Sequence, residues 1–168
     1  VHKRIRSLDP AGGASVLKIT VSPPPYILDF TSKLMHSLKW HGVAMIEFKV
    51  GIDQVPRLME INGRFWGSLP LAIFSGVDFP YLMYQYLRDG NIPEVLNYRT
   101  GVTSRYILGD FKNLFSVLFR SDPLRPYCYP PRTEAIRNFV STQADYEDVL
   151  DFKDWKPFAM DIIDKLIY

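Results

Sequence analysis

The feature that most constrains the fold is a pair of strand-like segments joined by a short polar connection. Residues 43–50 and 57–64 are rich in branched, aromatic and long apolar side chains, and Gly42 and Pro56 stand immediately before them. The connection between them, residues 51–55, begins with glycine and contains aspartate, which are typical turn residues. The sequence therefore predicts a β-hairpin.

The predicted hairpin has one apolar face and one polar face, because successive side chains of a strand point to opposite sides. The polar face carries two carboxylates, an amide, an ammonium and a guanidinium. The residues in phase on this face are Met45, Glu47 and Lys49 on the first strand and Leu58, Glu60, Asn62 and Arg64 on the second.

The register of this hairpin brings two acidic residues together. A symmetric hairpin that closes between Asp53 and Gln54 sets Glu47 directly across from Glu60. Two carboxylates in directly opposed positions repel each other unless another charge compensates them. The remaining pairs in this register are Lys49 with Leu58 and Met45 with Asn62.

Such a pair of carboxylates is typical of a site for a divalent cation. Mg²⁺ takes hard oxygen ligands, which the carboxylates of Glu47 and Glu60 and the side-chain carbonyl of Asn62 could supply. Arg64 follows on the same face, where it could neutralise charge on a transferred phosphoryl group. The alternative from spacing alone is a solvated polar face of an antiparallel sheet, which is common in proteins.

The remaining patterns alternate between helix and strand and complete an α+β chain. Apolar positions recur at helical spacing after the proline run at 23–25, and residues 68–88 show a helical pattern that Gly76 and Pro80 divide in two. We expect an antiparallel β-sheet with flanking helices. The other expected strands are 16–21 and 98–108, and the expected helices are 26–40, two short helices within 68–88, 111–119 and 155–168.

Composition excludes several classes of protein. Lysine and arginine number 20 against 18 acidic residues, so no excess of positive charge favours nucleic acid as a partner. The longest apolar run, Leu69 to Phe74, is too short to cross a bilayer, and no secretory segment opens the chain. The single cysteine, Cys128, excludes an internal disulfide. We expect a cytoplasmic protein with no nucleic-acid or membrane partner.

The sequence does not favour a histidine metal site or a nucleophilic serine. His2, His36 and His41 do not have the spacing of metal ligands. Ser68 follows a glycine, but the glycine-flanked pattern of a nucleophilic serine is absent, so we expect Ser68 to cap the following helix.

The hairpin residues resemble the metal-binding end of the ATP-grasp superfamily, which includes the carbamoyl-phosphate synthase large subunit, biotin carboxylase and many carboxylate–amine ligases. In these enzymes an acidic residue on one strand is followed by a Glu-x-Asn-x-Arg motif on the next. Here Glu47 precedes Glu60 by thirteen residues, and Asn62 and Arg64 complete the motif. The opening residues 2–4, followed by a pair of glycines, resemble the strand that enters the catalytic half of that fold.

This resemblance implies a set of roles. Glu47, Glu60 and Asn62 would bind the metal and through it the nucleotide, so that the implied cofactors are ATP and Mg²⁺ or Mn²⁺. Arg64 and Arg4 would be the catalytic residues, facing the transferred phosphate.

The resemblance also implies how the chain is divided. Residues 1–90 would form the C-terminal ATP-grasp subdomain, and residues 91–168 a helical extension packed on it. The nucleotide lid and hinge of the family are not present in this sequence. Because the first residue is Val1 rather than methionine, we expect this chain to be a piece of a longer protein, with the preceding part as its partner.

The activity implied is that of an ATP-dependent ligase. It would activate a small-molecule carboxylate as an acyl phosphate and couple it to an amine or another nucleophile, and the chain by itself would show no turnover. Two alternatives stay open: a bicarbonate-activating enzyme similar to carbamoyl-phosphate synthase or biotin carboxylase, and a non-catalytic interaction module. A homo-oligomer is also compatible with the sequence.

Overall fold

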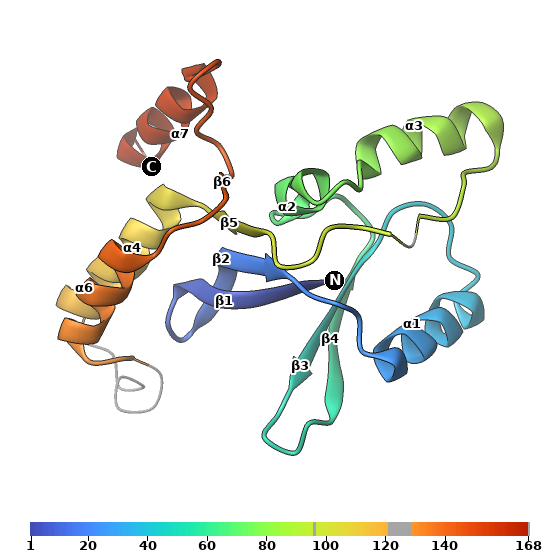
Figure 1. Ribbon diagram of the computed structural model, residues 1–168, viewed down its shortest axis with the longest axis horizontal. Helices are drawn as coiled ribbons and strands as arrows, with labels where there is room; N and C mark the ends of the chain where they lie inside the picture. Colours follow the sequence, from blue (N-terminus) through green and yellow to red (C-terminus); the bar gives the residue numbers. More distant parts are fainter. Residues whose placement is uncertain (96, 121–128, 168) are drawn as a thin grey trace.

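The computed structural model describes residues 1–95, 97–120 and 129–167, so Cys128 and Tyr168 lie outside the described part. There the chain is a mixture of helices and mainly antiparallel strands, which confirms the α+β class (Figure 1). The strands are β1 (His2–Asp9), β2 (Gly12–Thr20), β3 (Met45–Val50), β4 (Pro56–Asn62), β5 (Thr103–Arg105) and β6 (Tyr146–Glu147). The helices are α1 (Pro25–Ser37), α2 (Leu69–Phe74), α3 (Phe79–Asp89), α4 (Ile107–Phe119), α6 (Arg132–Ser141) and α7 (Lys156–Ile167).

The larger sheet has the strand order β1-β2-β5-β6, with antiparallel pairs except between β5 and β6. The smaller sheet is the predicted hairpin, β3-β4. Strands β5 and β6 come from beyond residue 90, so a single sheet joins the two ends of the described chain. In Figure 1 the pair α4 and α6 lies to one side of the larger sheet, and α1, α3 and the hairpin lie to the other.

A bulge in β1 decides which way two of its arginines point. Arg4 pairs with Lys18 and Arg6 pairs with Leu17, so Ile5 is an extra residue on β1. An extra residue shifts the alternation of side chains by one position. Arg4 and Arg6 therefore lie on opposite faces of the sheet, which we call the Arg4 face and the Arg6 face.

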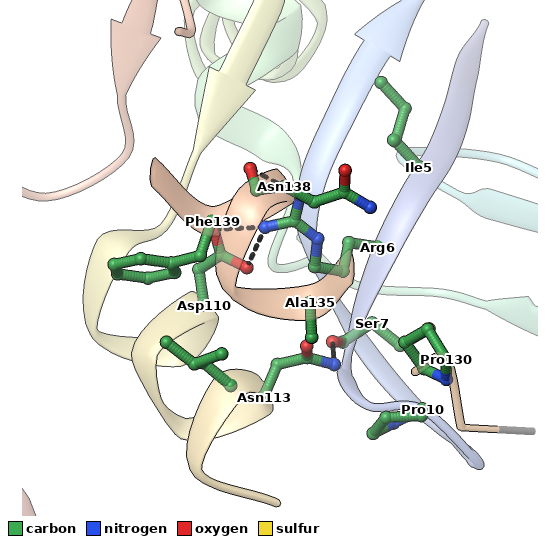
Figure 2. Close-up of a pocket in the computed structure, with 11 residues that line it drawn as sticks. Ile5, Arg6, Ser7, Pro10, Asp110, Asn113, Pro130, Ala135, Asn138 and Phe139 are labelled. Carbon is green, nitrogen blue, oxygen red and sulfur yellow. Dashed lines mark hydrogen bonds and ion pairs between the residues drawn. The ribbon is translucent and has the colours of Figure 1, made fainter. Parts of the chain in front are cut away.

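The Arg6 face is covered by α4, and its centre is a buried carboxylate (Figure 2). Asp110 is fully buried and accepts hydrogen bonds from Arg6 at 2.6 and 2.7 Å and from Arg105 at 2.7 Å. Both arginines share this face because each pairs with Leu17, one on either side of it. Arg105 also donates to the carbonyls of Phe139 and Thr142 at the end of α6. The network thus ties α4, α6 and two strands together.

Close approach of α4 to the sheet depends on a glycine. A Cβ atom at Gly109 would lie 2.4 Å from the ring of Tyr106 and 2.8 Å from Val16. Real Cβ atoms do not come that close to other atoms, so a larger side chain would push the helix away from β2. Among the described residues, the buried apolar side chains gather here and under α2: Val16, Leu17, Leu71, Ala72, Val117 and Ala135.

The hairpin pairs Glu47 with Glu60 and Met45 with Asn62, as predicted, but the predicted pairing of Lys49 with Leu58 is wrong. The register shifts after Glu47, so that Leu58 pairs with Phe48. The physical reason is a bulge at Met59, which moves Leu58 onto the apolar face. That face packs on α1 through an edge-to-face contact between Phe48 and Phe30, whose ring centroids are 5.8 Å apart.

The predicted strand 98–108 is mostly wrong. Only Thr103–Arg105 is a strand, because Gly101 has a φ of 80° that interrupts the extended backbone, and α4 already begins at Ile107. Tyr98 lies outside the sheet, and its hydroxyl donates a hydrogen bond to the carbonyl of Val21 at 2.6 Å. Helix α6 and strand β6 were not predicted.

Candidate functional site

The candidate site lies where the hairpin meets the Arg4 face of the larger sheet. Glu47 on β3 stands directly across from Glu60 on β4. From the other sheet, Arg4 donates to the Glu47 carboxylate at 2.5 Å, with the two side chains 38% and 31% exposed. The structure therefore brings together three of the predicted site residues, Arg4, Glu47 and Glu60, from two different sheets.

Asn62 joins this group through Glu60. Its side-chain amide donates to the Glu60 carboxylate at 2.6 Å. Each carboxylate thus has a donor of its own: the guanidinium of Arg4 for Glu47 and the amide of Asn62 for Glu60. The repulsion expected from the sequence is therefore partly offset without a metal ion. To offer its oxygen to a metal, Asn62 would have to turn its amide over.

Contrary to the sequence prediction, Arg64 does not lie on the polar face of β4 with Glu60 and Asn62. β4 ends at Asn62, and Arg64 lies in the bend that follows it. Its exposed guanidinium donates to the carbonyl of Phe65 at 3.0 Å. Arg64 is next to the site in sequence, but within the described part of the chain it forms no hydrogen bond or ion pair with Glu47 or Glu60.

His2 and Ser68 form a second pair at the same face, which the sequence did not predict. His2 lies two residues before Arg4 on β1, so the two side chains share a face. Nδ1 of His2 is 3.1 Å from the hydroxyl of Ser68. Burial lowers the pKa of His2 to about 4, and the nearby cation of Lys18 adds to this effect. The imidazole is therefore neutral at pH 7. Ser68 stands at the N-cap position of α2, as expected, but its hydroxyl makes no capping bond to the helix.

A buried ion pair lies beside Arg4 on the Arg4 face. Lys18 pairs in register with Arg4 on one side and Ser104 on the other, so all three share this face. Its ammonium forms an ion pair with Asp148, and these side chains are 1% and 7% exposed. Among the described residues, the hydroxyl of Ser104 and one oxygen of Asp148 are buried without a hydrogen-bond partner. Asp148 comes from beyond β6, so the C-terminal part of the chain supplies the charge that balances Lys18.

The donor set fits a metal ion that arrives with a nucleotide better than a metal ion alone. Among the described residues, no group of three or more histidine, cysteine, aspartate or glutamate side chains is placed to hold a metal. The site offers two carboxylates and one amide, and Mg²⁺ is commonly bound by one or two carboxylates together with substrate phosphates. Arg4 stands on the facing sheet, where its positive side chain would favour phosphate charge.

The cavity in Figure 2 is a different place. It has a volume of about 260 Å³ and lies on the Arg6 face, between β1, α4 and α6. Its arginine is already bound to Asp110 and Thr142. This cavity therefore lies apart from the carboxylate pair.

Comparison with known proteins decides the family. Residues 4–109 match the family described as ATP-grasp in the biosynthetic pathway with Ter operon. The chain belongs to this ATP-grasp family. Neither the curated proteins nor the solved structures that were searched contain a match.

The ATP-grasp match covers every residue of the carboxylate site and ends before Asp110. It shows a fold of the general ATP-dependent ligase type, as the resemblance implied. Asp148, the partner of Lys18, lies outside the matched range although it packs on the same sheet. No helix in the described ranges is long and apolar enough to span a membrane.

Proposed function

We propose that this ATP-grasp chain carries part of the active site of a ligase that activates a small-molecule carboxylate as an acyl phosphate and couples it to an amine or another nucleophile. The observation that carries the proposal is the direct pairing of Glu47 with Glu60 on antiparallel strands, with Arg4 reaching Glu47 from the other sheet. This arrangement lies within the residues that match the ATP-grasp family.

In this proposal Glu47, Glu60 and Asn62 hold Mg²⁺ or Mn²⁺ together with ATP. The bound metal ion would supply charge neutralisation at the phosphates. Binding requires Arg4 to leave Glu47 and Asn62 to turn its amide, because each now satisfies one of the carboxylates. Arg4 is then free to face the negative charge of the phosphates, so one side chain serves both states of the site.

The other polar side chains would position the substrates. Arg64 is exposed beside the end of β4, from where its long side chain can turn toward a transferred phosphoryl group. The neutral pair of His2 and Ser68 can accept or donate hydrogen bonds without adding charge. In-line positioning and charge neutralisation are the main needs of phosphoryl transfer.

The proposed partners follow from the same chemistry. They are a carboxylate, a nucleophile and a further segment of the same protein that encloses the nucleotide with a lysine-bearing lid. Such a segment would approach the Arg4 face, where the carboxylates are accessible. The protein would act in the cytoplasm, where ATP is abundant.

The test is product analysis with the full-length protein. With ATP, Mg²⁺, a pool of carboxylates and hydroxylamine as the nucleophile, we expect ADP, phosphate and a hydroxamate. Glu60→Gln should abolish all three products, whereas Asp29→Asn, at an exposed position on α1, should leave them unchanged. Release of AMP and pyrophosphate would contradict an acyl phosphate. Absence of any product from every carboxylate would favour a non-catalytic module.

A further inference from the structure

Helix α4 has its apolar and polar sides exchanged relative to a normal surface helix. Three phenylalanines follow one another at intervals of four residues and are exposed on one side: Phe111 by 59%, Phe115 by 58% and Phe119 by 69%. A helix on the surface of a soluble protein normally buries its apolar stripe. The residues that α4 buries are instead mostly small or polar: Gly109, Asp110, Asn113, Ser116 and Val117.

Helix α6 extends this surface. The rings of Phe111 and Phe139 are in edge-to-face contact, with centroids 6.2 Å apart. One residue after Phe139, Val140 is 77% exposed, and Ile136, one turn earlier, is 46% exposed. Figure 1 shows α4 and α6 together at the outer edge of the molecule. We call the exposed side chains the aromatic face: Phe111, Phe115, Phe119, Ile136 and Val140.

The aromatic face is large enough to be the core of an interface. The three phenylalanines offer about 150–250 Å² each, so their exposed fractions alone correspond to roughly 280–460 Å² of apolar surface, and Ile136 and Val140 add to it. The aromatic face is therefore comparable to the largest apolar patch on a typical monomer, about 300–600 Å². A stable interface covers about 800 Å² on each partner, including a polar rim. About 65% of a homodimer interface is apolar, which is roughly 520 Å² of 800 Å², so the aromatic face is of the size that the apolar part of such an interface needs.

The position of the aromatic face indicates what covers it. α4 packs on the Arg6 face of the sheet, whereas Arg4 and the carboxylate pair lie on the opposite face. Any segment that encloses the nucleotide must therefore approach from the side away from α4. The aromatic face points away from the site, and a partner seated on it would leave the site open.

We propose that the aromatic face is the interface of a homodimer, in which α4 and α6 of one copy pack on α4 and α6 of a second copy around a two-fold axis. Such an interface uses the same patch on both partners, so aromatic side chains meet aromatic side chains. The two sites then lie on the outer sides of the dimer. The aromatic face itself is a property of α4 and α6 alone, whereas the choice of a second copy as its occupant rests on the proposed position of the nucleotide site.

The test measures the mass of the full-length protein in solution by light scattering and sedimentation over a range of concentrations. We expect a dimer. Phe115→Glu and, as a second variant, Phe119→Glu should each weaken the dimer at least about 30-fold, as central aromatic residues of interfaces do, with an unchanged circular dichroism spectrum. The control is Leu87→Glu on α3, which is equally exposed at 72% and should remain dimeric.

A photo-crosslinker in place of Phe115 identifies the occupant. A covalent dimer linked between α4–α6 residues of two copies supports the proposal. A link within one chain, a link to lipid, or a monomer at every concentration overturns it. A dimer that survives both glutamate substitutions also overturns it, because the interface must then lie elsewhere.

Discussion

Removal of the Asp110 carboxylate should be among the most damaging single changes in this chain. Asp110 is fully buried, and the side chains of Arg6 and Arg105, whose guanidiniums it binds, are only 18% and 12% exposed. In Asp110→Ala these two cations stay close together in the interior without their counter-charge. Breaking a buried pair in this way costs about 3–5 kcal/mol. For a chain of this size each kcal/mol lowers Tm by about 2–4 °C, so the loss is roughly 6–20 °C.

The assay is denaturant unfolding followed by circular dichroism, with Asp110→Asn as a milder variant. Asparagine offers a single oxygen to the two arginines, so the free energy of unfolding of Asp110→Asn should lie between those of wild type and Asp110→Ala. The matched control is Asp29→Ala, which breaks the exposed ion pair with Lys33 and should cost less than about 0.5 kcal/mol. A loss below about 1 kcal/mol for Asp110→Ala would refute the argument that the two guanidiniums depend on this carboxylate.

Three further predictions concern the Arg4 face. Lys18→Met should lower the free energy of unfolding, measured with denaturant, by about 3–5 kcal/mol because it leaves Asp148 buried without its cation. Adding Asp148→Leu should restore most of this loss, and no recovery in the double variant would contradict the prediction. Because burial lowers the folded-state pKa of His2 to about 4, its contribution to stability is fully present above pH 6.5 and lost as the pH falls toward 4. His2→Gln should therefore weaken the pH dependence of the free energy of unfolding between pH 4 and 6.5. An NMR titration that gives His2 a pKa near 6.5 in the folded protein would contradict this prediction. Arg4→Gln should increase the rise in Tm that Mn²⁺ alone produces, because Glu47 loses the arginine that competes with the metal ion. The same substitution should weaken binding of ATP with its metal ion. Equal Tm shifts with Mn²⁺ in wild type and Arg4→Gln would contradict competition between Arg4 and the metal ion for Glu47.

Sequence periodicity was sufficient to predict the centre of the site. The alternation of β3 and β4 places Glu47 and Glu60 on one polar face, and they are paired as predicted. The pairs next to the turn, Lys49 with Arg57 and Val50 with Pro56, centre it on Asp53 rather than between Asp53 and Gln54, and the bulge at Met59 compensates for this difference. The pairing of Lys49 with Leu58 was wrong because a bulge at Met59 leaves no mark in a simple alternation.

Contacts between distant segments could not be predicted in the same way. The two-residue spacing of His2 and Arg4 was a usable signal for a shared face, and a lysine within the apolar strand 16–21 was a signal of a buried cation. The sequence gives no signal that Ser68 meets His2 or that Asp148 meets Lys18, because these pairs are 66 and 130 residues apart. Helix α6 follows a pair of prolines, which is a common helix start, and could have been predicted.

The most direct test of the central claim is to locate the metal nucleotide by NMR. Mn²⁺ with ATP, added to the protein, should broaden backbone amide signals of β3 and β4 around Glu47 and Glu60 before those of any other segment. Glu60→Gln should remove this selective broadening, and Asp53→Asn, in the turn of the same hairpin, should preserve it. Broadening centred on another acidic segment, or unchanged in Glu60→Gln, would contradict the assignment of these two carboxylates as the metal-nucleotide site.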